Sequence, residues 1–140
     1  MKAIVFDDPV RIGEWVAQRT GGIYTPQDSY AMGLEQNGEI IAGVWFDGYN
    51  GASINMHVAA TGKDWMNRKF LQMAFDYPFN KAKVYKIIGL VCSSNVAARR
   101  FDEHLGFILE ADVKSATTGG DLLIYTMTRE QCRHLAKEPL

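Results

Sequence analysis

The stretch between residues 86 and 107 constrains the fold of this chain more than any other. Residues 86–92 are apolar without alternation, which is typical of a strand covered on both faces. The helix that follows carries apolar residues on one side, namely Ala97, Ala98, Phe101 and Leu105. Gly106 ends this helix, since glycine tolerates a left-handed C-cap. A buried strand that leads directly into an amphipathic helix predicts an α/β domain.

The first part of the chain predicts a helix and then an antiparallel meander. Asp8 is placed to cap a helix with Pro9 at its first position, and Gly21-Gly22 end it. Asn37-Gly38 tolerates the positive φ angles of a tight hairpin turn between residues 32–36 and 39–46. A second turn, at residues 47–51, leads into a strand over 52–60. These signals predict three consecutive antiparallel strands.

The pattern changes after Gly62. Apolar residues at helical spacing predict a helix over residues 64–77 that Pro78 breaks. After the helix that Gly106 ends, two strands are expected at 107–113 and 122–128, with a short terminal helix over 129–137. No linker or repeat divides this order. We therefore expect residues 1–140 to form one domain.

Composition excludes several classes of function. The chain has 140 residues and a formal net charge of −1, which provides no field to hold a nucleic-acid backbone. No apolar run reaches the roughly 18 residues that a transmembrane helix needs, so we expect no membrane partner. Cys92 and Cys132 are isolated, and the histidines lack metal-ligand spacing, so neither a disulfide framework nor a metal site is expected. A reducing, cytoplasmic location is the default expectation.

The second half of the chain resembles the GNAT acyl-CoA N-acyltransferases. Asn95 follows the predicted buried strand, Ala98 comes three residues later, and Gly106-Phe107 closes the helix. The resemblance covers roughly residues 32–128, most of the chain. It implies a mixed sheet, with an antiparallel meander and a central parallel strand pair, flanked by helices on both faces. The two parallel strands should separate at one end and form the acyl-CoA cleft.

The expected phosphate-binding turn departs from the family pattern. The family uses a glycine-rich turn, because bare backbone N–H groups at a helix start can bind phosphate oxygens. In the corresponding segment, residues 61–68, Lys63 replaces an arginine, while Met66 and Arg68 replace glycines. Lys63 and Arg68 either bind phosphate by charge or are ordinary solvated cations in a decayed site. Some phage-encoded GNAT-like proteins, including an internal virion protein, have a similar Gly-Lys-rich turn.

The resemblance implies a set of residues that contact the cofactor. These are Met56, Val58, Lys63, Asn67, Arg68, Asn95 and Arg99. Asn95 is expected at the pantetheine arm or the reacting region, although asparagine is also a favoured helix N-cap. Arg99 would reach the phosphates or instead pair with Asp102 or Glu103.

The candidate catalytic residues are Asp102 and His57. Asp102 occupies the position, seven residues after Asn95, where many family members have the tyrosine that protonates the departing thiolate. An aspartate can act as that acid only if its surroundings raise its pKa. His57 lies on a strand expected to line the cleft and could deprotonate the attacking amine, or it could be a packed strand residue. Glu35 is a further candidate base, and His104 is expected to be an exposed surface residue.

The expected function is transfer of an acyl group, acetyl above all, from acyl-CoA to a primary amine that remains unidentified. Positioning of the two substrates alone could also supply the catalysis. The alternative is a GNAT-fold protein without catalysis that serves in binding or virion assembly. The sequence leaves open whether the chain forms a homodimer. The aromatic residues Trp45, Phe46 and Tyr49 would line a substrate groove or belong to the core.

Overall fold

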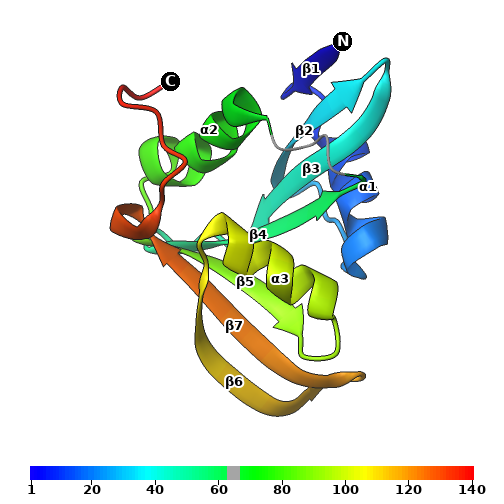
Figure 1. Cartoon of the computed structure of the whole chain (residues 1–140), viewed down its shortest axis with the longest axis vertical. Coiled ribbons are helices and arrows are strands. Elements are labelled where there is room, and N and C mark those ends of the chain that lie inside the picture. The colour runs from blue at the N-terminus through cyan, green and yellow to red at the C-terminus, as the bar shows by residue number, and fades with distance from the viewer. Residues whose placement is uncertain (63–66) are drawn as a thin grey trace.

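The computed structural model describes residues 1–62 and 67–140 and contains one seven-stranded mixed sheet with the strand order β1-β2-β3-β4-β5-β7-β6 (Figure 1). The strands are β1 (Lys2–Val5), β2 (Tyr30–Gln36), β3 (Glu39–Asp47), β4 (Ser53–Ala60), β5 (Lys86–Cys92), β6 (Ile108–Thr117) and β7 (Gly120–Thr128). The α-helices are α1 (Pro9–Thr20), α2 (Arg68–Asp76) and α3 (Val96–Leu105).

The antiparallel half of the sheet follows the predicted turns. Asn37 and Gly38 have φ angles of 54° and 83°, so they form the tight turn between β2 and β3. Strand β4 returns antiparallel to β3 as far as the pair Ala42 and Ala60. The short edge strand β1, which pairs with β2, was not predicted.

The parallel pair at the centre of the sheet is short. β4 and β5 pair only at Ser53 with Lys86, Ile54 with Ile87, and Asn55 with Ile88. Beyond these three pairs the strands separate, whereas β5 stays paired with β7 along its whole length. The predicted central parallel pair is therefore confirmed, and its separation creates the cavity described below.

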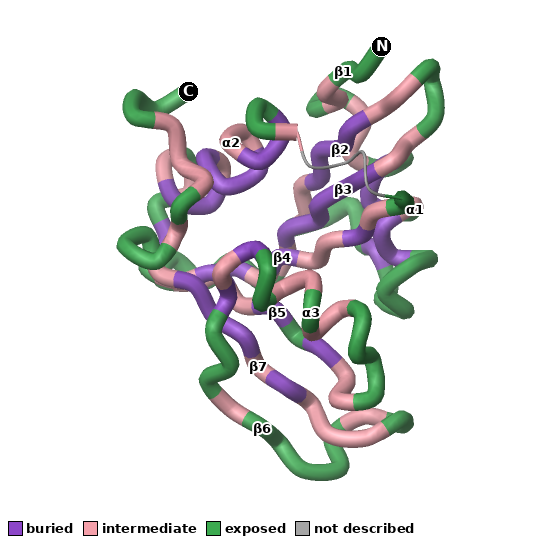
Figure 2. The backbone as a smooth tube through the Cα atoms, in the orientation of Figure 1, coloured by how far each residue is buried: buried purple, intermediate pink, exposed green. Residues whose placement is uncertain are grey.

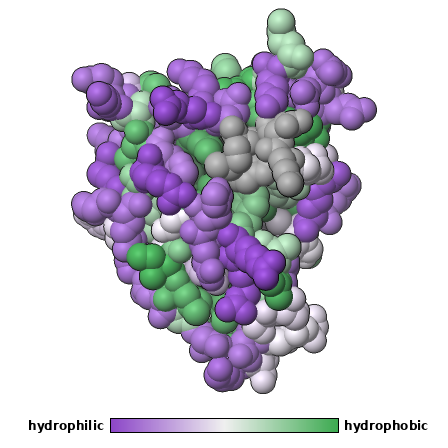
Figure 3. All heavy atoms as spheres, viewed as in Figure 1, coloured by the Kyte–Doolittle hydropathy of each residue, from purple (hydrophilic) through white to green (hydrophobic). Residues whose placement is uncertain are grey.

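Helices cover both faces of the sheet, but unequally. On one face α1 packs over β2, β3 and β4, around a small core that includes Ile12, Val16 and Trp45. On the other face α2 and α3 enclose the main core, and the buried segments of both cores are purple in Figure 2. In the space-filling view, hydrophilic residues cover most of the visible face and separate the hydrophobic patches (Figure 3).

The exposure of one face of β5 corrects the expectation that residues 86–92 are covered on both faces. Ile87 and Val91 are buried in the main core, whereas Leu90, on the opposite face, is 42% exposed. The reason is that α1 packs on β2 to β4 and leaves that face of β5 open. The apolar run therefore marked a strand correctly but not its complete burial.

The helix after Gly62 differs from the prediction at both ends. Residues 64–66 lie outside the described residues, and α2 begins at Arg68 because the Asn67 side chain caps it, accepting from Phe70 N–H at 2.9 Å. Pro78 does not end the helical path. A π-helical turn, Tyr77–Lys81, continues through it, and Ala82 N–H donates to Tyr77 C=O at 2.9 Å. Pro78 sits at the start of this turn, where its missing N–H is not needed.

Two predictions near the C-terminus are also wrong in extent. The hairpin of β6 and β7 is longer than expected, because pairing continues to Thr117 and Gly120 after an irregularity in the register. The predicted helix over residues 129–137 is only a 3-10 turn, Arg129–Gln131, held by a capping box between Thr128 and Gln131. Among the described residues, the structure has no helix of the length and apolarity that crossing a membrane requires.

Candidate active site

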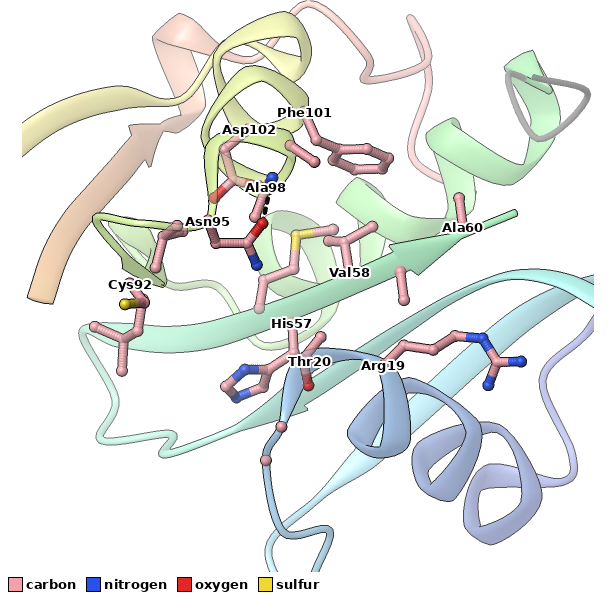
Figure 4. Close-up of a pocket in the computed structure, with 17 residues that line it drawn as sticks. Arg19, Thr20, His57, Val58, Ala60, Cys92, Asn95, Ala98, Phe101 and Asp102 are labelled. Carbon is pink, nitrogen blue, oxygen red and sulfur yellow. Dashed lines mark hydrogen bonds between the residues drawn. The ribbon is translucent and has the colours of Figure 1, made fainter. Parts of the chain in front are cut away.

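A cavity of about 520 Å³ lies where β4 and β5 separate (Figure 4). Its walls come from the end of α1, from β4, from β5 and from the first turns of α3. The lining residues are Arg19, Thr20, Gly21, Gly22, Met56, His57, Val58, Ala59, Ala60, Leu90, Val91, Cys92, Asn95, Ala97, Ala98, Phe101 and Asp102. The cavity thus brings together Met56, Val58, Asn95 and both candidate catalytic residues.

Asn95 performs the structural role weighed above. Its side-chain oxygen accepts a hydrogen bond from Ala98 N–H at 3.1 Å and so caps α3. The same residue lines the cavity, and its backbone N–H is bound to Cys92 C=O at 2.9 Å. The cap fixes the start of α3 beside the end of β5, and the predicted contact with a pantetheine arm stays a prediction.

Asp102 lies on α3 directly over β5. A Cβ atom added to Gly89 would lie 3.0 Å from Asp102 Oδ2, which is closer than an ordinary contact, so the carboxyl group packs against the strand where this glycine has no side chain. Burial, followed by the nearby charge of Glu103, raises the pKa of Asp102 to about 7. Within the described residues this carboxyl group has neither an ion pair nor a hydrogen-bond partner. The elevated pKa that a catalytic aspartic acid requires is therefore present.

His57 lies on the other side of β4 from Asp102, next to Thr20 (Figure 4). Its Nε2 is 2.9 Å from Asp47 Oδ1, and its ring stacks on Trp45 with a centroid distance of 4.2 Å. The His57 side chain is 17% exposed. His57 is thus a packed strand residue, as one interpretation proposed. It also lines the cavity, as a catalytic role would require.

Asp47 is a residue that sequence reasoning missed, since it was assigned to a turn. It ends β3, and its interaction with His57 follows from the hairpin register, in which Trp45 pairs with His57 and Asp47 with Asn55. Residues two apart on paired strands are diagonal neighbours on the same face of a sheet. An explicit register for the second hairpin would have found this contact.

The predicted cofactor residue Arg99 does not line this cavity. Its Nε lies 3.5 Å from the Tyr125 hydroxyl, which donates to Glu103 Oε2 at 2.6 Å. Hydrogen bonding and the charge of the Tyr125 side chain raise the pKa of Arg99. Arg99 is thus linked to Glu103 through the Tyr125 hydroxyl, whereas the alternative considered from the sequence was direct pairing with Asp102 or Glu103.

The expected phosphate turn is described only in part. Lys63 and Met66 lie outside the described residues, so their predicted roles stay predictions. Asn67 is the cap of α2, and Arg68 is the exposed first residue of that helix. Neither Asn67 nor Arg68 lines the cavity where β4 and β5 separate. The N-terminus of α2 nevertheless presents backbone N–H groups beside a cation, as phosphate binding needs.

Other candidates fall outside the cavity. Glu35 pairs with Arg11 at 2.5 Å, so its side chain is engaged away from the lining residues. Trp45 and Phe46 are buried core residues, and Tyr49 is 56% exposed. Phe46 and Tyr49 line a second cavity of about 650 Å³, which they share with Tyr30 and Tyr77. His104 is exposed, as predicted.

Cys92 was missed as a lining residue because its predicted strand was expected to be fully covered. Its thiol lies 3.2 Å from Ser94 Oγ and 3.1 Å from Thr117 Oγ1. These two hydrogen bonds lower the pKa of Cys92. In the described ranges 1–62 and 67–140, His, Cys, Asp and Glu side chains form no group of three or more suited to a metal ion.

The fold of the chain is similar to that of solved N-acetyltransferases. Mutant forms of the spermidine/spermine N-acetyltransferase from Vibrio cholerae superpose with a TM-score of 0.72 at 14% identity, over 93% of this chain and 96% of that chain. The dodecameric spermidine N-acetyltransferase from the same organism gives 0.70 at 14% identity, over 92% and 94%. A probable acetyltransferase gives 0.62 at 14% identity, over 84% of this chain and 68% of that chain.

Sequence comparisons give no corresponding match: neither a protein-family model nor a curated protein matches this chain. At such low identity, the likeness to solved structures establishes the fold. The predicted fold class is therefore confirmed: the chain has a GNAT-like mixed sheet flanked by helices on both faces.

Proposed function

We propose that this chain is an acyl-CoA-dependent N-acyltransferase that moves an acyl group, acetyl above all, to a primary amine. The observation that carries the proposal is the Asp102 carboxyl group, which has a pKa of about 7 and lines the cavity where β4 and β5 separate. The shared fold with solved N-acetyltransferases supports the reaction class.

The separated strands fit the pantetheine arm of acyl-CoA. β4 remains paired with β3 as far as Ala60, but its pairing with β5 ends at Asn55. Beyond that residue, the β5-facing backbone groups of β4 border a cavity, where they need hydrogen-bond partners. The amide groups of a pantetheine arm can supply them in the way that an added strand does. Met56 and Val58 would then provide the apolar wall near the thioester.

The phosphates of the cofactor would lie near the N-terminus of α2. Arg68 and Lys69 are exposed there, and a helix N-terminus favours anions through its dipole and its N–H groups. In this arrangement Arg68, with Lys63 and Asn67, replaces a glycine-rich cradle by side-chain contacts. Asn95 adds a proposed contact from α3, whereas Arg99 would reach the cofactor only by leaving its contact with the Tyr125 hydroxyl.

The two candidate catalytic residues suit a direct transfer. His57 accepts a proton from the acceptor ammonium, directly or through water, and leaves a neutral amine. The amine nitrogen then attacks the thioester carbon, so that a C–N bond forms and the C–S bond breaks. The departing thiolate takes the proton of Asp102, and the nitrogen gives its second proton to water, so that an amide and a free thiol remain. Exchange with water then returns His57 and Asp102 to their starting protonation states. The proton transfer from Asp102 to the thiolate is favourable because an ordinary thiol has a pKa near 8.5, above the value of about 7 for Asp102.

Their positions agree with these separate roles. Figure 4 shows Asp102 with α3 on one side of β4, and His57 near the end of α1 on the other. In this arrangement the amine would approach the carbonyl carbon from the His57 side of the cavity, and the thiolate would leave on the Asp102 side. Such positioning contributes to catalysis in addition to proton transfer.

The first test is binding and turnover by the whole chain. Acetyl-CoA at 100 times its dissociation constant should stabilise the fold by roughly 2.7 kcal/mol, measured as a shift in thermal melting. Mass spectrometry should detect the acetylated product in a panel of primary amines that includes spermidine, since the fold neighbours include a spermidine N-acetyltransferase. Stabilisation without any product would favour the non-catalytic alternative, and the absence of both would refute the proposal.

Variants test the two roles. Asp102→Asn and His57→Ala should each lower kcat about 10²-fold or more, while the affinity for CoA stays close to that of the wild type. Asp112→Asn is the matched control, because Asp112 lies on β6 and pairs with Lys114 at 3.0 Å. Unchanged turnover in both active-site variants would leave positioning as the mechanism.

A further inference from the structure

The hairpin of β3 and β4 builds a defined pair of side chains at the edge of the active-site cavity. Asp47 Oδ1 and His57 Nε2 are 2.9 Å apart, although the residues are ten positions apart in sequence. The Asp47 side chain is 29% exposed and that of His57 is 17% exposed. The pair is thus partly shielded from water, while His57 still lines the cavity.

The imidazole ring of His57 is held by a stacking contact on its face as well as by the hydrogen bond at Nε2. It stacks on Trp45 at an interplanar angle of 30°. Trp45 is itself buried, donates from Nε1 to Ser29 Oγ at 3.2 Å, and meets Tyr24 edge to face. A ring that is stacked on a fixed surface and hydrogen-bonded at one nitrogen has little freedom to rotate.

The charge state of Asp47 determines which nitrogen of His57 carries the proton. Burial alone would raise the pKa of Asp47, but the hydrogen bond and charge of His57, with a hydrogen bond from Asn55, together lower it. Asp47 is therefore a carboxylate near neutral pH, and a carboxylate only accepts hydrogen bonds. Nε2 must then carry the hydrogen, which leaves the lone pair of a neutral imidazole on Nδ1.

The other charged and titratable groups around the cavity do not take over this role. Arg19, on α1, places its guanidinium 3.8 Å from the centroid of the Trp15 ring and donates to Trp15 C=O. Asp102, on α3, lies on the opposite side of β4 in Figure 4. Cys92, on β5, is bound to Ser94 and Thr117. Of the acidic side chains in the part of the chain that the structure describes, Asp47 is thus the one that contacts His57.

We propose that Asp47 is a positioning residue for the reaction: it fixes the Nε2–H tautomer and the orientation of His57, so that Nδ1 accepts the proton of the attacking amine. The kinetic part of this inference rests on the proposed acyltransferase function. The tautomer does not, because it follows from the hydrogen bond and the charge of Asp47. The two can therefore be tested separately.

The structural test is nitrogen-15 NMR of the histidine side chains in the intact chain at pH 8. Two-bond proton–nitrogen correlations distinguish the tautomers, and His57→Gln assigns the signals among the three histidines. We expect the Nε2–H pattern for His57 in the wild type and a mixture containing the Nδ1–H form in Asp47→Asn. Asp112→Asn should keep the wild-type pattern. An Nδ1–H pattern in the wild type would overturn the inference, whether or not the protein turns over.

The kinetic test is a double-mutant cycle. Asp47→Asn should lower kcat about tenfold or more with little change in the KM for acetyl-CoA. In a His57→Gln background the same substitution should cause no further loss, because the two residues act as one unit. Melting temperatures of all variants separate this effect from unfolding. Equal losses from Asp47→Asn in both backgrounds, or full activity of Asp47→Asn in folded protein, would show that Asp47 does not act through His57.

Discussion

Replacing Asp102 by asparagine should change how the stability of the fold depends on pH. The pKa of Asp102 is raised from its ordinary value near 4 to about 7, so the native state binds this proton more tightly than the unfolded chain. The stabilisation is complete below about pH 4 and is lost as pH rises through 7. An asparagine has the shape of the protonated acid and nothing to ionise, so the variant lacks this loss.

The magnitude follows from the shift. About three pKa units, at 1.36 kcal/mol each, correspond to about 4 kcal/mol of stability lost by the wild type but not by Asp102→Asn. The variant should therefore gain on the wild type by about 1.4 kcal/mol per pH unit between pH 5 and 7, with little further change above pH 8. Any constant offset from the substitution itself cancels when the two proteins are compared across pH.

Urea unfolding at several pH values between 5 and 8 measures this difference directly. Asp121→Asn is a suitable control. Hydrogen bonding from Ser115 N–H leads the causes that lower the pKa of Asp121, so its ionisation is complete below this range. The control should differ from the wild type by the same amount at pH 5 and pH 8. A pH-independent difference for Asp102→Asn as well would show that Asp102 ionises like an ordinary carboxyl group and would remove the case for it as the acid.

Three further predictions test the surroundings of the site. Arg68→Ala should weaken CoA binding by about 1–3 kcal/mol and make the binding less dependent on salt. Calorimetric titration measures this, with dephosphorylated pantetheine as the control ligand, and wild-type affinity of the variant for CoA would show that Arg68 does not bind phosphate. Gly89→Ala should lower stability by about 1–3 kcal/mol in thermal melting, because its Cβ would meet Asp102 Oδ2 at 3.0 Å; an unchanged melting temperature would contradict that packing. Asn67→Ala should cost about 1 kcal/mol in urea unfolding through loss of the cap on Phe70 N–H, whereas Asn67→Asp should retain it, and equal losses would argue against capping.

The sequence was most informative where structure is set locally. The Asn37-Gly38 turn, Pro9 at the start of α1 and the left-handed Gly106 at the end of α3 were predicted from nearby residues, and all three occur. Local signals were less reliable where tertiary contacts decide. The path through Pro78 is an example, since buried Asp76 binds the Asn80 side chain across the π-helical turn at 2.6 Å.

The residues of the candidate site were predictable in part, but their electrostatics were not. The resemblance indicated Asp102 and His57, and both line the same cavity. Burial, followed by the nearby charge of Glu103, raises the pKa of Asp102. The close approach of Asp102 to Gly89 on β5 is a tertiary contact, which the spacing of residues along α3 cannot reveal. The partner of His57 required the register of the β3–β4 hairpin, whose turn lacks the tight Asn-Gly signal of the first hairpin.

The short joint between β4 and β5 has a mechanical consequence. Three residue pairs connect a four-stranded half, β1 to β4, with a three-stranded half, β5 to β7. A molecule seated in the gap would add rungs to the ladder where the protein supplies none. Bound cosubstrate would then join the backbones of the two halves of the sheet, and its departure after transfer would leave the three β4–β5 residue pairs as the backbone pairing between them.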